Sequence, residues 1–142
     1  MKCSEIMQKE VVTCDETESA SDCARAMGEQ NIGFVPLVNA RGFVIGTITD
    51  RDLVVGGLAA GKDGASPNGD LMSRDLVACS PEEDVRSCER KMSDEKKSRV
   101  LVLQGGRCYG VISLSDIARV EDLSRAGEVL RRVTQREERP IH

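Results

Sequence analysis

The sequence has few aromatic residues and almost no histidine. Its 142 residues include two Phe, one Tyr and no Trp, and the only histidine is His142 at the C-terminus. Proteins that bind nucleic acid rely on aromatic stacking or on a broad basic face. This chain instead carries a formal net charge of −4. We therefore regard nucleic acid as a disfavoured partner.

A long apolar segment is also missing. No apolar run approaches the roughly 20 residues that a membrane-spanning helix needs. The first five residues, MKCSE, lead into no signal-peptide hydrophobic region. We expect a cytoplasmic protein that does not enter a membrane. With 39% hydrophobic residues, the chain can build one compact domain or two very small ones.

Signatures of a metal or catalytic site are absent as well. The six cysteines stand at positions 3, 14, 23, 79, 88 and 108, and no two of them form a Cys-x-x-Cys pair. This spacing is unusual for zinc, and a reducing cytosol disfavours disulfides. There is no Cys/His arrangement for nucleophilic catalysis. We predict no metal site, no catalytic residue and no enzyme activity, with small thiols buried in the core.

What the sequence does contain is an internal repeat. The segment 46–53, GTITDRDL, recurs as 110–117, GVISLSDI. Both copies have a glycine, apolar residues, a hydroxyl residue, two spacers, an aspartate and an aliphatic residue. Met7 and Met72 are 65 residues apart, as are Cys14 and Cys79, and Cys23 and Cys88. Four cysteines thus form two repeat-related pairs, which favours core positions over chemistry.

Each copy predicts a β-α-β-β-α unit. In the first copy we expect strands at 11–14, 33–38 and 43–48, a helix after a capping box at 15–18, and a second helix at 50–58. In the second copy we expect strands at 76–79, 99–103 and 108–113, a helix after a capping box at 80–83, and a second helix at 115–123. The apolar faces of the first helices are Ala20, Cys23, Ala24 and Met27, and then Val85, Cys88 and Met92. A unit of this size buries little sheet alone, so the copies should pack on each other.

The predicted boundaries divide the chain into four parts. Repeat 1 spans 1–58, a linker 59–70, repeat 2 71–119, and a C-terminal helix and tail 120–142. The tail repeats apolar residues at positions 120, 123, 126, 130 and 133, which predicts an amphipathic helix. Interspersed glutamates favour docking on this module or on a partner subunit over binding to a membrane surface or to RNA.

The strand-to-helix junctions carry the most chemistry. A hydroxyl residue, Thr49 or Ser113, ends each strand, and an aspartate, Asp52 or Asp116, follows three residues later. The N-terminus of a helix attracts anions, and a carboxylate accepts hydrogen bonds from a sugar diol. Phosphate and ribose are therefore the first ligand to consider. The same spacing also satisfies a capping box, so a purely structural role remains open.

The repeat closely resembles a tandem pair of cystathionine-β-synthase (CBS) domains, a Bateman module, of the stand-alone bacterial type. The segments that carry the resemblance are 31–38 and 46–53 in the first copy, and 100–103, 105–107 and 110–118 in the second, with leading segments at 6–7 and 71–73. It spans roughly residues 4–120. The implied fold is α+β, with two β-α-β-β-α repeats packed sheet to sheet about a pseudo-two-fold axis.

The resemblance implies two clefts for AMP, ADP or ATP, and in some members NAD or S-adenosylmethionine. Asp52 and Asp116 would accept the ribose, and Thr49 and Ser113 would lie beside the ribose-phosphate. The base would be lined by Ile32, Phe34, Pro36, Thr47 and Val111, and the phosphate would meet Arg51 or Arg99. Leu101 stands where the family has a proline-containing strand start. Because the second copy departs from the pattern there, we expect one good site rather than two.

The resulting hypothesis is a regulatory module that senses an adenosine nucleotide and requires no cofactor. Homodimers are common in this family, and the apolar faces of the second helices would form the contact. A separate effector protein would receive the signal. The alternative is a structural or dimerisation module with vestigial clefts.

Overall fold

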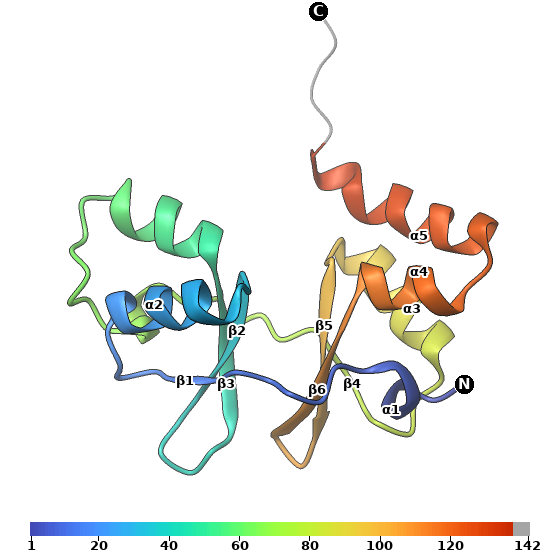
Figure 1. Cartoon of the computed structure of the whole chain (residues 1–142), viewed down its shortest axis with the longest axis horizontal. Coiled ribbons are helices and arrows are strands. Elements are labelled where there is room, and N and C mark those ends of the chain that lie inside the picture. Colours follow the sequence, from blue (N-terminus) through green and yellow to red (C-terminus); the bar gives the residue numbers. More distant parts are fainter. Residues whose placement is uncertain (138–142) are drawn as a thin grey trace, which may run out of the picture. The chain divides into compact units, whose positions relative to one another are not determined.

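The computed structural model describes residues 1–137 (Figure 1). The chain forms two compact units. We name them after their aspartates. The Asp52 unit comprises Val11–Leu76, and the Asp116 unit comprises Met1–Glu10 together with the chain from Val77 onward. No helix within residues 1–137 has the length and apolar character needed to cross a membrane.

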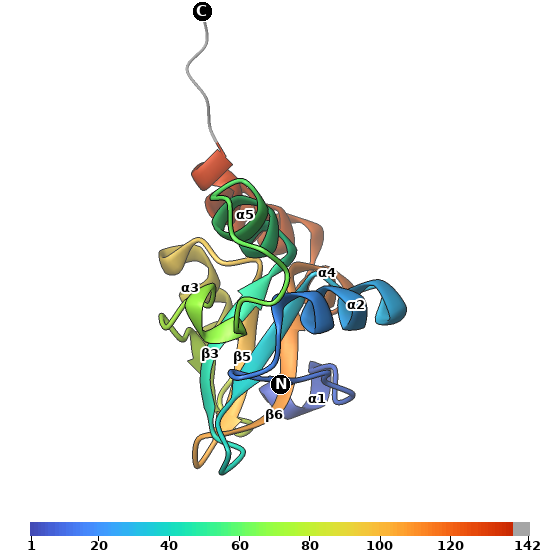
Figure 2. The same ribbon diagram turned by 90° about the vertical axis from the view of Figure 1, so that its left-hand side faces the viewer.

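The Asp52 unit is built on a three-stranded sheet. Strand β2 (Phe34–Val38) lies between β1 (Cys14–Asp15), which runs parallel to it, and β3 (Val44–Thr49), which runs antiparallel. Helix α2 (Ala20–Gln30), the π-helix η1 (Asp52–Leu58) and the short η2 (Asn68–Asp70) complete the unit. Figure 2 shows η1, in green, directly beyond the end of β3. The core residues are Cys14, Ala20, Cys23, Met27, Val35, Leu37, Ile48 and Leu71.

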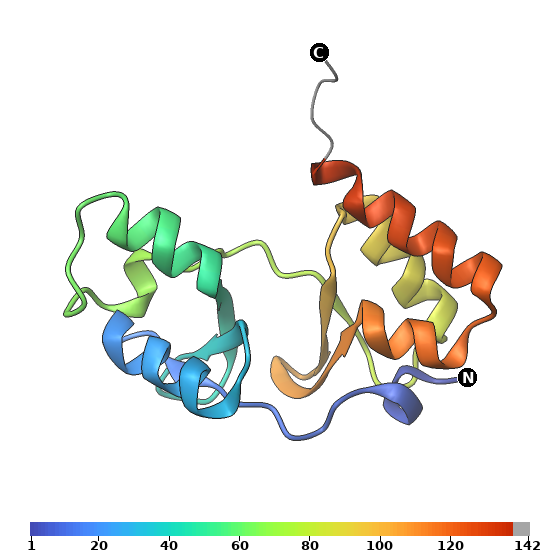
Figure 3. The same ribbon diagram turned by 45° about the horizontal axis from the view of Figure 1, so that its top comes forward.

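The Asp116 unit repeats this plan and adds helices. Its sheet has the order β4 (Ala78–Cys79), β5 (Arg99–Gln104), β6 (Arg107–Ser113). The helices are α1 (Cys3–Ile6), α3 (Val85–Glu95), α4 (Leu114–Val120), α5 (Leu123–Thr134) and η3 (Gln135–Glu137). Helix α5 packs against both α3 and α4, as Figure 3 shows. The core gathers Cys3, Cys79, Val85, Cys88, Met92, Val100, Val102, Ile112, Ile117, Val129 and Val133.

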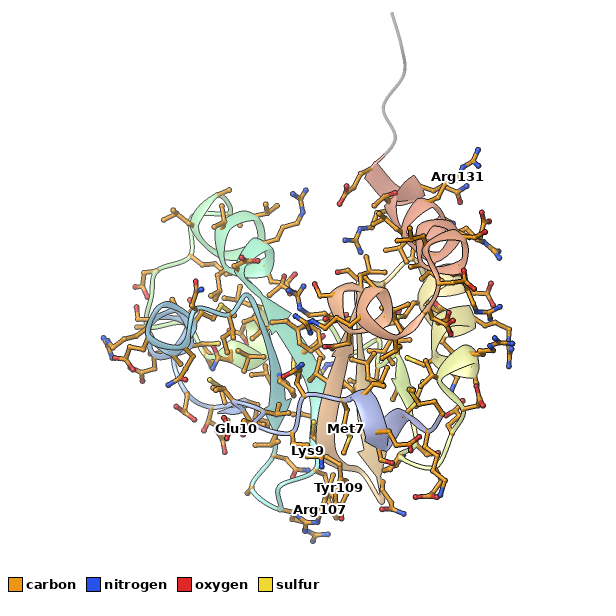
Figure 4. All side chains as sticks on the ribbon, turned by 45° about the vertical axis from the view of Figure 1, so that its right-hand side comes forward. Met7, Lys9, Glu10, Arg107, Tyr109 and Arg131 are labelled. Carbon is orange, nitrogen blue, oxygen red and sulfur yellow. The ribbon has the colours of Figure 1, made fainter. Side chains whose placement is uncertain are left out.

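The compact units divide the chain differently from the sequence repeats at 1–58 and 71–119. The leading segment of each repeat pairs with a strand of the other repeat. Gln8 and Val111 exchange backbone hydrogen bonds of 2.9 and 3.1 Å, and Ser73 and Thr47 exchange bonds of 2.8 and 2.9 Å. Met7 lies against β6, the strand that carries Tyr109; both residues are labelled in Figure 4. The segment predicted as a linker is likewise packed, because Ser66 and Gly64 accept hydrogen bonds from the start of α2.

The first helix of each repeat begins later than the capping boxes predicted. One of the two bonds of each box is present, since Asp15 N donates to Glu18 Oε1 over 2.8 Å and Ser80 N donates to Glu83 Oε2 over 2.9 Å. The return bonds of Glu18 N and Glu83 N go to the backbone carbonyls of Asp15 and Ser80 and not to their side chains. They close turns, however, and the helices begin after Ser19 and Asp84, whose side chains cap them. Of the predicted apolar face of α2, Ala20, Cys23 and Met27 are buried, whereas Ala24 is exposed. The core strands β2, β3, β5 and β6 lie within one residue of their predicted ends, whereas β1 and β4 are shorter.

The predicted tail helix is present as α5, but its apolar stripe was only partly right. The chain breaks at Glu121, and Asp122 caps a new helix. Leu123 and Leu130, expected to pack, are 91% and 50% exposed. Val133 is buried as predicted, and Val129, which was not in the predicted stripe, is buried as well. The break changes the phase of the helix relative to the residues before it. The remainder of the predicted tail, 138–142, lies outside the described residues.

A buried carboxylate helps to hold α5 in place. Glu89 on α3 is 1% exposed, and its Oε1 accepts a 3.0 Å hydrogen bond from Arg125 Nε on α5. Its Oε2 has no partner within residues 1–137. Arg125 also lies 3.6 Å from Glu121 Oε1. Burial, and then the neighbouring Glu121, raises the pKa of Glu89 to about 7.

We predict that Glu89→Gln stabilises the protein in mildly alkaline solution. Burial raises the pKa of Glu89 above its ordinary value of 4.5. The protonated side chain therefore makes its full contribution to the stability of the fold at pH values below 4.5. This contribution is lost as pH rises through about 7. Glutamine stays neutral and still accepts from Arg125. The variant should unfold at the wild-type temperature near pH 5, and should be more stable by about 1–3 kcal/mol near pH 8. Thermal unfolding at both pH values measures this, with the exposed Glu128→Gln as the control; a pH-independent difference would contradict it.

Candidate functional site

The Asp116 junction lies where β6 passes into α4. Ser113 caps the helix, and its Oγ accepts a hydrogen bond from Asp116 N over 3.3 Å. In return, Asp116 Oδ2 accepts from Ser113 N over 2.8 Å and from Ser113 Oγ over 3.0 Å. The capping box expected from the sequence is therefore confirmed here. These bonds occupy one carboxylate oxygen of Asp116, which is 3% exposed.

The other oxygen of Asp116 is also occupied. Oδ1 accepts from Gln8 Nε2 over 2.8 Å and from Arg119 Nη1 over 3.0 Å. Gln8 comes from the leading segment paired with β6, and Arg119 comes from the next turn of α4. Sequence reasoning missed both residues. Asp116 thus receives four donors from its own chain, two at each oxygen.

The Asp52 junction has the same cap but fewer donors. Asp52 Oδ2 accepts from Thr49 N over 2.9 Å, and Asp52 N donates to Thr49 Oγ1 over 3.1 Å. Oδ1 accepts no hydrogen bond from any residue in 1–137. The side chain is partly exposed, and η1 begins at this residue with π-type hydrogen bonds. A carboxylate oxygen that accepts no hydrogen bond from the described residues therefore lies at the start of η1. Turns of π-helix are frequent at functional sites.

The internal repeat explains this difference. By the offset of the leading segments, Gln8 corresponds to Ser73, and by the offset of the second helices Arg119 corresponds to Val55. Ser73 Oγ accepts from Asp75 N over 3.3 Å. Serine is too short to act as Gln8 does, and valine has no donor. Two substitutions between the copies thus leave the Asp52 oxygen without the donors that Asp116 has.

The predicted base-lining residues occupy one face of each hairpin. Phe34 pairs with Thr49 across the β2–β3 ladder, and Pro36 pairs with Thr47. Residues two apart on a strand share a face, and the intervening Val35 and Ile48 point into the core. The other unit follows the same rule, with the pairs Arg99–Ser113 and Leu101–Val111. Ile32 instead packs against the core around α2.

The two predicted phosphate-binding arginines remain available. Arg51 lies at the N-cap of η1 and is exposed, and Arg99 opens β5 and is also exposed. Neither side chain forms a hydrogen bond or ion pair with the described part of the chain. Arg51 directly precedes Asp52 in the sequence, and Arg99 pairs with Ser113 across the β5–β6 ladder, so each lies near the junction of its unit.

Residues 56–62 match the string Gly-x-x-x-x-Gly-Lys. In a phosphate-binding loop this string connects a strand to a helix and ends in Ser or Thr. Here it follows the start of η1 and is succeeded by Asp63. Lys62 Nζ is 3.4 Å from the carbonyl of Asp70. The segment is therefore the end of a helix and not a phosphate loop.

Two stretches of the chain, residues 3–56 and 69–122, match the family model of the CBS domain. The chain therefore belongs to the CBS domain family and contains the domain twice. This confirms the predicted family and the α+β fold of two repeats.

Several known proteins are similar to this chain. The CBS domain-containing protein YhcV of Bacillus subtilis is 28% identical over 112 residues, which are 79% of each chain. The crystal structure of Hypoxic Response Protein I with two coordinated zinc ions matches with a TM-score of 0.78 and 28% identity, over 86% of this chain and 100% of that one. The CBS domain pair of protein MJ0100, in complex with 5′-methylthioadenosine and S-adenosyl-L-methionine, matches with a TM-score of 0.75 and 26% identity, over 84% of this chain and 94% of that one.

Proposed function

We propose that this protein is a cytosolic regulatory module that binds an adenosine-containing ligand. The observation that carries the proposal is the unoccupied Oδ1 of Asp52 at a strand-to-helix junction. A ribose diol offers two hydroxyl donors, and a carboxylate with an open oxygen accepts them. Thr47, Thr49, Phe34 and Pro36 share one face of the adjoining hairpin. Support also comes from the similar MJ0100 domain pair, which is in complex with two adenosine derivatives.

The two junctions should differ in affinity. At Asp116 a ribose would have to displace Gln8 or Arg119 from Oδ1 before it could bind. Hydrogen bonds to a charged group contribute roughly 1.5–3 kcal/mol each, so this displacement costs affinity. At Asp52 no such donor must leave. We therefore assign the principal ribose contact to Asp52, with Arg51 as the nearby cation for the phosphate.

A panel of adenosine ligands tests the function. AMP, ADP, ATP, NAD, S-adenosylmethionine and 5′-methylthioadenosine are each added to the purified protein, and thermal unfolding is recorded. A ligand at a hundredfold excess over its Kd should stabilise the fold by about 2.7 kcal/mol. Asp52→Ala should abolish the rise. If no ligand raises the unfolding temperature, the protein is instead a structural module with vestigial clefts.

A binding module regulates by linkage: the ligand changes the stability of an assembly that forms through a surface separate from the ligand site. We propose a homodimer formed through η1, whose Val54, Val55 and Leu58 are 55%, 51% and 77% exposed. A separate effector protein would read the ligand-bound dimer. Leu58→Glu should shift the protein toward the monomer in sedimentation experiments, whereas Leu123→Glu on α5 should not. Equal dimer content in both variants would exclude this surface.

A further inference from the structure

Three buried thiols meet in the core of the Asp116 unit. Cys3 lies on α1, Cys79 on β4 and Cys88 on α3. Their Sγ atoms all lie within 4.8 Å of one another. None of the three residues is more than 3% exposed. Helix α1, which is distant in the sequence, and the neighbouring elements β4 and α3 thus direct one sulfur each toward a common point.

The backbone fixes the position of Cys3 in this cluster. Cys3 N donates to Glu83 O over 2.8 Å, and Val85 N donates to Met1 O over 2.9 Å. The carbonyl of Cys3 in turn accepts from Met7 N over 3.0 Å. The first turn of the chain is therefore tied to the segment that leads into α3, which carries Cys88. Ligands held in this way lose little freedom when a metal binds.

The repeat provides an internal comparison for the third thiol. In the Asp52 unit Cys14 and Cys23 occupy the places of Cys79 and Cys88, but Asn68 occupies the place of Cys3. Asn68 repeats the backbone bonding of Cys3, since its N donates to Glu18 O and its carbonyl accepts from Met72 N. It is fully buried, and its Oδ1 has no partner within the described residues. Packing at this position therefore does not require cysteine, and the third sulfur calls for another explanation.

We propose that Cys3, Cys79 and Cys88 form a binding site for one Cu(I) ion. Soft thiolate sulfurs select Cu(I), Zn or iron–sulfur clusters among metals. Structural zinc is almost always held by four ligands in a tetrahedron. No fourth His, Cys or carboxylate ligand joins the three sulfurs within residues 1–137. A soft ion that accepts three sulfur ligands fits this donor set best.

The surroundings bear on the charge of such a complex. Three thiolates and Cu(I) would carry a net charge of −2, which is costly in an apolar core. The ammonium group of Lys91 is a positive charge near Cys79, because Nζ donates to the carbonyl of the preceding residue, Ala78, over 2.9 Å. The same group pairs with Glu83 over 2.8 Å. Since thiols must lose protons to bind, affinity should rise with pH.

Anaerobic titration with Cu(I) against a chromophoric chelator tests the site. Wild-type protein should take up one tightly held equivalent. Cys3→Asn, which installs the residue of the other repeat, should weaken this uptake by more than the roughly 10- to 100-fold caused by loss of an outer-shell partner. Cys14→Ser, which removes one of the two core thiols of the Asp52 unit, should leave Cu(I) uptake unchanged. Asn68→Cys should add a second equivalent. X-ray absorption of the wild-type complex should show three sulfur neighbours.

Three results would overturn the proposal. The first is equal Cu(I) uptake by the wild type and by Cys3→Asn with both proteins folded. The second is a first shell of fewer than three sulfurs, which needs no variant and so does not depend on folding of Cys3→Asn. The third is Zn(II) displacing Cu(I) at equal concentrations, which would indicate a fourth ligand.

Discussion

Exchanging the donors around the two aspartates is expected to move ligand affinity from one junction to the other. The double variant Ser73→Gln with Val55→Arg places at the Asp52 junction the two residue types that occupy Asp116 Oδ1. Its affinity for AMP, measured by calorimetry, should fall by roughly 10- to 100-fold, because displacing a hydrogen bond to a charged group costs about 1.5–3 kcal/mol. The converse variant, Gln8→Ser with Arg119→Val, should create a second binding event at Asp116.

The controls separate this effect from general changes in surface charge. Arg25 and Asp22 on α2 form an ion pair at a spacing of three residues with an N···O distance of 3.0 Å, as Arg119 and Asp116 do. Arg25→Val removes a comparable arginine and should leave AMP binding unchanged. Because Val55 also belongs to the proposed dimer surface, Leu58→Glu serves as the second control: it alters that surface without adding a donor for Asp52, and its affinity for AMP should exceed that of the double variant. Unchanged affinity in the Ser73→Gln, Val55→Arg protein would show that Asp52 Oδ1 does not receive the ligand. The module could then still bind an adenosine ligand elsewhere, which the panel with Asp52→Ala would reveal.

The repeat itself could be predicted from the sequence, because both of its signals are local. Short apolar runs on either side of a glycine-containing turn define β2, β3, β5 and β6, and the recurring hydroxyl and aspartate define the two junctions. Helix starts were less predictable. Asp15 and Ser80 have the composition of caps, but Ser19 and Asp84 compete for the same role and succeed. A local motif records which side chain can cap a helix and not which one does.

The difference between the two aspartates could not be predicted from the junctions alone. Gln8 donates to Asp116 across 108 residues of sequence, so the contact exists only because the leading segment pairs with the strand of the other repeat. The Arg119 contact is three residues away and was available to a search of the helix face. The three-thiol cluster has the same origin as the Gln8 contact, since Cys3 reaches Cys79 and Cys88 through that leading segment.

Adding a methyl group at the two glycines under the leading segments is expected to destabilise the protein. A Cβ at Gly46 would lie 2.6 Å from Met72 Sδ and 2.7 Å from Ser73 O, and a Cβ at Gly110 would lie 2.7 Å from Met7 Sδ and 2.9 Å from Gln8 O. The methionine can turn aside, but the carbonyl oxygens belong to the backbone bridges with Thr47 and Val111. Gly46→Ala and Gly110→Ala should therefore each lower the free energy of unfolding by about 1–3 kcal/mol.

The same substitution at Gly127 should have the opposite sign. Gly127 lies inside α5, and an added Cβ there would meet no atom within 4 Å. Because alanine favours the helix by up to about 1 kcal/mol over glycine, Gly127→Ala should stabilise the protein. Chemical denaturation of the three variants measures the contrast. Gly110→Ala should also weaken the hydrogen bond from Gln8 Nε2 to Asp116, because the added methyl group displaces the carbonyl oxygen of Gln8. If all three variants unfold at the same denaturant concentration, the leading segments do not depend on close backbone contact. The explanation that the leading segment holds Gln8 against Asp116 would then fail as well.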